Sequence, residues 1–192
     1  MEANPKLPVT DGQYQALCAA CDALIPAIPA PEGDDVTFWE TKASDLGVPD
    51  RILEVIAIQN PDEQAEFQQL LKLMESGFIM GLLGGGFKKF RSQPQEKQER
   101  ILQKWSESRL GKLRKAFGSL KKLTTFIFYG SSTEESRGGK TYYSNPTWKS
   151  IDYAGPLNIK AGTKPAIRTL IIDREEELHC QTLVIGSGAG GG

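Results

Sequence analysis

Residues 110–128 read LGKLRKAFGSLKKLTTFIF, and their apolar residues recur at the spacing of an α-helix. With successive residues about 100° apart around a helix axis, the apolar ones share one arc: Leu110, Leu113, Phe117, Leu120, Leu123, Ile127 and Phe128. The opposite arc is basic: Lys112, Arg114, Lys115, Lys121 and Lys122. The pattern predicts an amphipathic helix that packs on a core and turns a solvated basic face outward. Lying on an anionic membrane surface is the alternative.

Upstream, helix start signals recur, so residues 1–128 are predicted to form a helical N-terminal domain. Thr10 with Gln13 three residues later fits a capping box. Asn60-Pro61-Asp62-Glu63 combines a capping Asn, a Pro suited to the first helical position and an early acidic residue. Asp50 is expected to cap a further helix.

The character of the chain changes after residue 128. Residues 129–177 are predicted to be a connecting segment with turns and one extended stretch. Within it, residues 129–140 are polar and glycine-rich and are expected to form a loop. Residues 178–185 end in Leu183-Val184-Ile185, an apolar run suited to a buried parallel strand.

That predicted strand leads into a glycine-rich stretch with the spacing G-x-G-x-x-G at Gly186, Gly188 and Gly191. After a strand, this spacing is typical of a dinucleotide-binding turn, in which glycines let the backbone approach a pyrophosphate. The predicted cofactor-binding residues are Gly186, Ser187, Gly188, Ala189, Gly190 and Gly191. Residues 178–192 are therefore expected to begin a truncated α/β Rossmann-type domain. The pattern alone leaves FAD and NAD open, and a flexible glycine tail is the alternative.

Bulk properties exclude some classes of function. The 192 residues carry a formal net charge of −1, which does not favour nucleic-acid binding. No stretch has the apolar length of a transmembrane span, and the N-terminus lacks the apolar core of a signal peptide. The odd number of cysteines, 3, favours a reducing, intracellular setting.

No arrangement of residues predicts a catalytic or metal site. Cys18 and Cys21 form C-x-x-C, but both fit the apolar stripe of the first helix, so a metal role with His179 and Cys180 is disfavoured. The chain has one histidine and neither G-x-S-x-G nor H-E-x-x-H. Catalytic residues and metal ligands are thus both predicted as none.

Three stretches together resemble one family. They are LCAACDALIPAI (17–28), NPTWKSIDYAGP (145–156) and CQTLVIGSGAGGG (180–192). In this order they look like the N-terminal part of long-chain (fatty) alcohol oxidases, a branch of the glucose–methanol–choline flavoprotein oxidoreductases. The resemblance covers nearly the whole chain, although the middle helices match in character more than in residues.

The resemblance implies an FAD-dependent oxidase that converts long-chain primary alcohols to aldehydes while oxygen is reduced to hydrogen peroxide. It implies that Gly186, Gly188 and Gly191 hold the FAD pyrophosphate and that the catalytic histidine belongs to a C-terminal region absent here. The chain is therefore expected to be an inactive N-terminal fragment, with membrane-surface association as a further expectation. The alternatives are a free-standing helical interaction or membrane-surface module with a disordered glycine tail, and an NAD-dependent dehydrogenase.

Overall fold

The computed structural model describes residues 5–83, 86–137, 140–153, 179 and 181. Local sequence signals mark where several of its helices begin. The chain divides into two units, Met1–Pro156 and Leu157–Gly192, and the elements below all belong to the first. They are α1 (Asp11–Leu24), α2 (Val36–Glu40), η1 (Ala43–Leu46), α3 (Val48–Ala57), α4 (Pro61–Glu75), α5 (Gly77–Leu82), η2 (Phe90–Ser92), α6 (Gln95–Ser106), α7 (Gly111–Gly130), β1 (Thr133–Arg137), β2 (Lys140–Ser144) and α8 (Pro146–Ser150).

The predicted caps of α1 and α4 are confirmed. The Gln13 amide donates to Thr10 Oγ1 at 3.3 Å, and the Thr10 amide donates to Gln13 Oε1 at 2.9 Å. At α4 the Glu63 amide donates to Asn60 Oδ1 at 2.9 Å, with Pro61 in the first turn. These contacts satisfy backbone donors that have no partner inside a helix.

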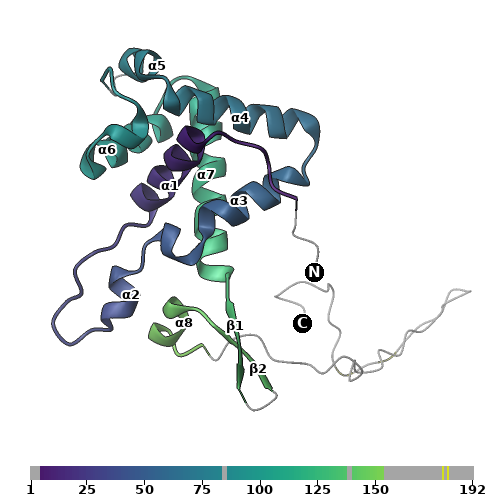
Figure 1. Ribbon diagram of the computed structural model, residues 1–192. Helices are drawn as coiled ribbons and strands as arrows, with labels where there is room; N and C mark the ends of the chain where they lie inside the picture. The colour runs from purple at the N-terminus through teal and green to yellow at the C-terminus, as the bar shows by residue number, and fades with distance from the viewer. Residues whose placement is uncertain (1–4, 84–85, 138–139, 154–178, 180, 182–192) are drawn as a thin grey trace, which may run out of the picture. The chain divides into compact units, whose positions relative to one another are not determined.

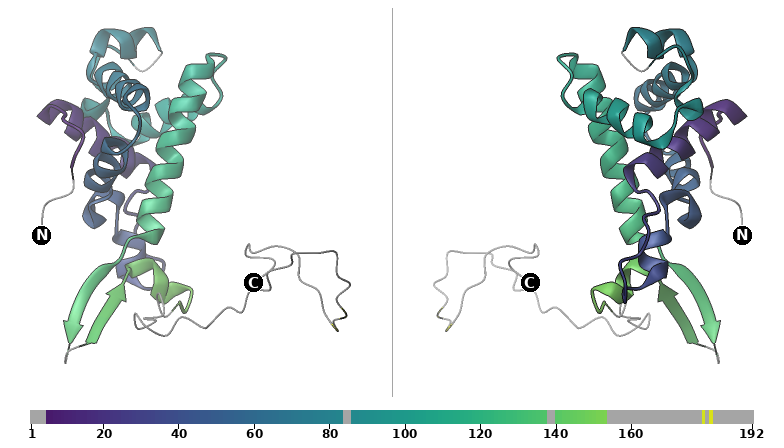
Figure 2. Two further views of the ribbon diagram at one scale, coloured as in Figure 1. Left: turned by 90° about the vertical axis from the view of Figure 1, so that its right-hand side faces the viewer. Right: turned by 90° about the vertical axis from the view of Figure 1, so that its left-hand side faces the viewer.

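The core of the described module forms where α1 meets α3, α4, α6 and α7 (Figure 1). Leu17, Ala20 and Cys21 of α1 are fully buried there. Seen from the sides, α7 runs along one side of the other helices (Figure 2). The predicted apolar arc of α7 is confirmed within the helix: Leu113, Leu120, Ile127 and Phe128 are buried, and Phe117 and Leu123 are partly buried against the core. Leu110 precedes the helix and is exposed.

The predicted fold class is wrong in its second half. The described residues are mainly helical, and they contain no strand of a Rossmann sheet. The strands that the structure describes, β1 and β2, form one antiparallel pair. A Rossmann sheet needs parallel strands joined by crossover helices, which this pair cannot provide. The residues expected to form the first such strand, 178–185, lie outside the described residues except for His179 and Gln181.

The hairpin also corrects the loop expected at residues 129–140. α7 continues to Gly130, and β1 then pairs with β2 in a register from Thr133↔Ser144 to Arg137↔Lys140. Thr133–Arg137 reads TEESR and lacks the apolar alternation of a half-buried strand, so its own sequence did not mark it. Backbone pairing with Lys140–Ser144 makes it a strand.

The start of α3 differs from the prediction as well. Asp50 was expected as its cap, but the helix begins at Val48 after Gly47, which has a φ of 66°. Glycine adopts this left-handed conformation without the penalty that a Cβ brings. Gly47 therefore ends η1 and starts α3 at once, and the Asp50 side chain is left for other contacts.

Candidate functional site

A groove of about 580 Å³ lies where α3, α4 and α7 meet. Eight of its lining residues are charged or polar, while most of its exposed lining surface is apolar. The apolar lining residues are Val55, Ile56, Phe67, Leu70, Leu73, Leu113, Ala116, Leu120 and Leu123. A concave site of this size and composition is typical of ligand-binding pockets.

Helical periodicity explains why these side chains converge. On α7, Leu113, Ala116, Leu120 and Leu123 succeed one another three or four residues apart, which places them on one face. Phe67, Leu70 and Leu73 follow the same spacing on α4. Ala116 carries the smallest side chain among the apolar lining residues of α7. We infer that this small residue leaves space between the helices that a leucine would occupy.

The rim of the groove carries charges of both signs. Glu63 and Glu66 come from α4, and Lys112, Lys115 and Lys122 come from α7. Lys115 Nζ lies 2.7 Å from Glu66 Oε2. This hydrogen bond from Lys115 lowers the pKa of Glu66, and the same contact raises the pKa of Lys115. With Glu66 paired in this way, lysines outnumber the remaining carboxylates at the rim.

A second surface is the exposed apolar cluster formed by Phe78, Ile79, Leu82 and Phe87, which we name the α5 tip. Phe78 is 66% exposed, Leu82 69% and Phe87 76%. The Phe87 ring lies against Gly81, where an added Cβ would come within 2.5 Å of the ring. Exposed apolar clusters of this kind mark interaction sites more often than scattered apolar residues do.

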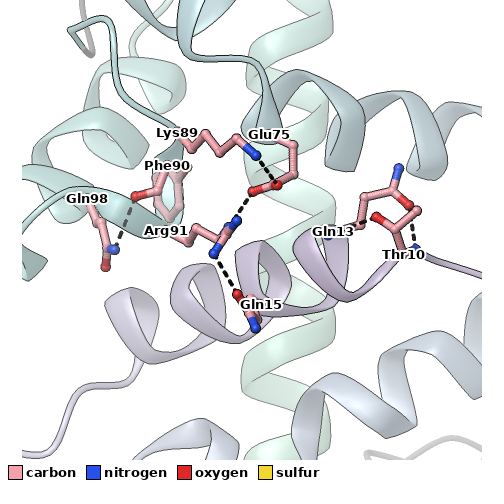
Figure 3. A network of polar contacts seen from close by, with 8 residues as sticks. All are labelled: Thr10, Gln13, Gln15, Glu75, Lys89, Phe90, Arg91 and Gln98. Carbon is pink, nitrogen blue, oxygen red and sulfur yellow. Dashed lines mark hydrogen bonds and ion pairs between the residues drawn. The ribbon is translucent and has the colours of Figure 1, made fainter.

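Ion pairs hold the segment that follows the α5 tip (Figure 3). Glu75 of α4 accepts from Lys89 Nζ at 3.2 Å and from Arg91 Nε at 2.9 Å. Arg91 also donates through Nη1 to Gln15 Oε1 of α1 at 2.6 Å, and Gln98 Nε2 donates to the Phe90 carbonyl at 3.2 Å. The segment from Lys89 to Arg91 is thereby anchored to three helices, so the α5 tip projects from a fixed base.

The cysteines predicted to be structural lie on α1. Cys21 is buried, with Sγ 3.6 Å from Thr124 Oγ1 of α7, and burial raises the pKa of its thiol to about 12. Burial also raises the pKa of the half-buried Cys18 thiol. Thiols with raised pKa values are poor nucleophiles and poor metal ligands. Within the described ranges, no three His, Cys, Asp or Glu side chains gather as a metal site would require.

The predicted cofactor-binding residues, Gly186, Ser187, Gly188, Ala189, Gly190 and Gly191, lie outside the described residues and stay a prediction. The sequence analysis missed both surfaces described above. The α5 tip had a signal, because no acidic residue lies between Glu75 and Glu96 and an apolar run is followed there by three glycines and the stretch FKKFR (87–91). The groove had only a weak one, the small residue Ala116 within the apolar face of α7.

The basic face of α7 bears on the membrane expectation. A helix that binds a bilayer surface buries its own apolar face in the lipid. The apolar face of α7 is instead packed in the protein core. In the part of the chain that the structure describes, no helix combines the length and the apolar character needed to cross a membrane.

Comparison with known proteins places this helical module among oxidoreductase-related sequences. A profile of the family described as gluconate 2-dehydrogenase subunit 3 matches residues 11–155. A long-chain-alcohol oxidase from Arabidopsis thaliana is 26% identical over 157 residues, which cover 74% of this chain and 21% of the oxidase. The chain thus spans about a fifth of the length of that relative. No solved structure matches the chain.

Proposed function

Because the chain belongs to the gluconate 2-dehydrogenase subunit 3 family, we propose that its helical module is the accessory part of an FAD-dependent long-chain-alcohol oxidase. In this proposal the complete oxidase converts long-chain primary alcohols to aldehydes and reduces oxygen to hydrogen peroxide. The helices described here do not perform that chemistry. They support the catalytic part or supply it with substrate.

The proposal rests on one observation: sequences related to this helical module are named either as a dehydrogenase subunit or as an oxidase. The family is named as one subunit of a dehydrogenase, whereas the plant relative is an oxidase of which the matched region is about a fifth. A module found both as a subunit and as a minor part of a longer chain is suited to an accessory role. Both names denote oxidoreductases, so the reaction class is the shared element.

The described residues support a non-catalytic role. The groove is lined mainly by aliphatic side chains, and no glycine is among its lining residues. A flavin dinucleotide needs backbone amides of a glycine-rich turn near its pyrophosphate. The groove does not fit that requirement, so no step is assigned to FAD within these helices. The flavin of the proposed oxidase is bound elsewhere.

Flavin absorption and peroxide release by the purified native protein would test this proposal. An antibody raised against residues 5–153 would be used to purify the protein from its source. We expect flavin absorption and peroxide release that depends on a long-chain alcohol such as dodecanol and not on ethanol. The 192-residue chain expressed alone is the control, and we expect it to be helical, colourless and inactive. A colourless native protein without alcohol-dependent peroxide release would refute the proposal.

A second candidate function, a membrane-surface module, is favoured by the α5 tip. Its exposed phenylalanine and leucine side chains are followed by Lys88, Lys89 and Arg91, with no acidic residue between Glu75 and Glu96. Lys89 and Arg91 both pair with Glu75, so these three cations face one carboxylate and the segment keeps an excess of positive charge. Apolar side chains that enter the headgroup region and lysines that contact anionic lipid are the two components of interfacial binding. This site is separate from the basic face of α7 that suggested membrane binding at first.

Sedimentation with lipid vesicles tests this second candidate. We expect the chain to bind vesicles that contain phosphatidylserine, and the double variant Phe78→Ser/Leu82→Ser to lose most of that binding. Phe126→Ser is the matched control, because Phe126 is 80% exposed but lies on α7. Equal binding by both variants, or equal binding to neutral vesicles, would exclude the α5 tip as a lipid site.

A further inference from the structure

We propose that the groove between α3, α4 and α7 binds one long unbranched aliphatic chain, with an anionic head group held at its lysine rim. The choice of long-chain ligands rests on the proposed function. The site itself is argued from the described helices. It would make the module a carrier or sensor of the long-chain compounds on which the proposed oxidase acts.

The dimensions of the groove suit such a chain. Its lining on α7 extends from Lys112 to Leu123, which is about 16 Å along the helix axis. This is close to the extended length of an alkyl chain of roughly 12 carbons. The volume of about 580 Å³ lies in the range of small-molecule sites. An unbranched chain can therefore lie along the whole apolar floor of the groove.

The lining chemistry selects an alkyl chain over a polar ligand. Leu70 and Leu73 of α4 face the same space as Leu120 and Leu123 of α7. A polar ligand would leave its hydrogen-bonding groups unsatisfied against this floor. The lining also includes Gln59, Gln69 and Ser119, which are too few to satisfy a sugar or a nucleotide along its length. A second concavity of about 270 Å³ on α6 is lined mostly by charged residues and lacks such a floor.

The charges of the rim favour an anionic head group over a cationic one. Lys115 is already paired with Glu66, whereas Lys112 and Lys122 also line the groove. Glu63 is the remaining carboxylate of the rim. A fatty carboxylate gains attraction from the lysines in excess, and a cationic head group is repelled by them. An alcohol head group should rank between the two.

Calorimetric titration of the 192-residue chain would rank the ligands. Below their critical micelle concentrations, we expect dodecanoate to bind more tightly than dodecanol, and dodecanol more tightly than dodecyltrimethylammonium. Decanoate should bind about 10-fold more weakly than dodecanoate, because two fewer methylene groups are buried. Equal affinity for the three head groups, or no saturable binding, would overturn the proposal.

Matched variants on α7 locate the site. Ser119 is exposed and lines the groove, so Ser119→Trp fills the groove without replacing a core residue, and we expect at least a 10-fold loss of affinity. Gly118→Trp is its control, because a Cβ at Gly118 meets nothing within 4 Å and the residue does not line the groove. Lys122→Gln should weaken dodecanoate about 3-fold and leave dodecanol unchanged. Lys121→Gln is the control for lost charge.

Circular dichroism of each variant shows that it is folded. Wild-type affinity in folded Ser119→Trp would overturn the proposal. So would self-association that Ser119→Trp abolishes, combined with no amphiphile binding, because the occupant would then be a protein. Failure here leaves the flavin and peroxide test of the native protein unaffected, so the two proposals can fail separately.

Discussion

Asn145→Ala should destabilise the module far more than loss of an ordinary helix cap. Asn145 is 5% exposed and caps α8, where its Oδ1 accepts from the Thr147 amide at 2.8 Å and from the Thr147 hydroxyl at 2.7 Å. Its Nδ2 donates to the carbonyls of Phe128 at 2.7 Å and Ser131 at 2.6 Å. One side chain thus joins α8 to the C-terminal end of α7, across the hairpin.

The magnitude follows from a matched cap. Asn60 caps α4 by accepting one exposed amide hydrogen bond, so Asn60→Ala should cost about 1 kcal/mol. Asn145→Ala removes a similar cap and also leaves two carbonyls without their donor. Each such loss in a buried setting costs about 1 kcal/mol or more. We therefore expect a decrease of about 3 kcal/mol in the free energy of unfolding, and the difference between the two variants isolates the two donor bonds.

Urea unfolding followed by far-ultraviolet circular dichroism would measure both variants. Asn145→Asp separates the cap from the donor bonds, because its carboxylate still accepts from Thr147 but faces the carbonyls of Phe128 and Ser131. It should be at least as destabilising as Asn145→Ala at neutral pH, and less so in acid, where protonation restores one donor. A loss for Asn145→Ala no larger than that for Asn60→Ala would refute this reasoning.

Two further predictions concern titratable groups on α1 and α3. Cys21 should resist iodoacetamide at pH 8 in the folded chain and Cys18 should react slowly, because burial raises the pKa of both thiols; peptide mass mapping would show this, and fast alkylation of Cys21 would contradict its burial. The hydrogen bond from Lys6 (2.9 Å), with one from Tyr14 Oη (2.8 Å), lowers the pKa of Asp50. The resulting stabilisation is present above the ordinary aspartate pKa of about 3.8 and is lost as pH falls through the lowered value. Asp50→Asn should therefore be destabilising near neutral pH and nearly neutral in strong acid, as measured by urea unfolding, whereas a pH-independent difference would exclude this role.

The sequence by itself determined where several helices start and which faces they bury. Thr10 with Gln13, and Asn60 with Glu63, act across three residues of chain, so their contacts hold in any fold that keeps the helix. The apolar period of residues 110–128 likewise predicted the buried face of α7. These signals are local, and for that reason they were readable before any tertiary contact was known.

The contacts of Asp50 are set by residues distant in sequence and not by its place at the start of a helix. Its position before an apolar helix suggested a cap, yet its carboxylate bonds to Tyr14, 36 residues away in sequence, and to Lys6. The helix instead starts at Gly47, which adopts the left-handed conformation that ends η1. The hairpin is a similar case, because TEESR becomes a strand only when it pairs with Lys140–Ser144.

Only the tertiary structure decided the surfaces on which function is proposed. The groove needs α3, α4 and α7 side by side, and the segment after the α5 tip is joined to α4 by the ion pairs of Glu75 with Lys89 and Arg91. It also showed that the strands described form an antiparallel pair and not part of a Rossmann sheet, whereas the strand expected at residues 178–185 lies outside the described residues except for His179 and Gln181. A helix cap is set by atoms a few residues apart, whereas grooves, exposed clusters and sheet partners depend on contacts between segments distant in sequence.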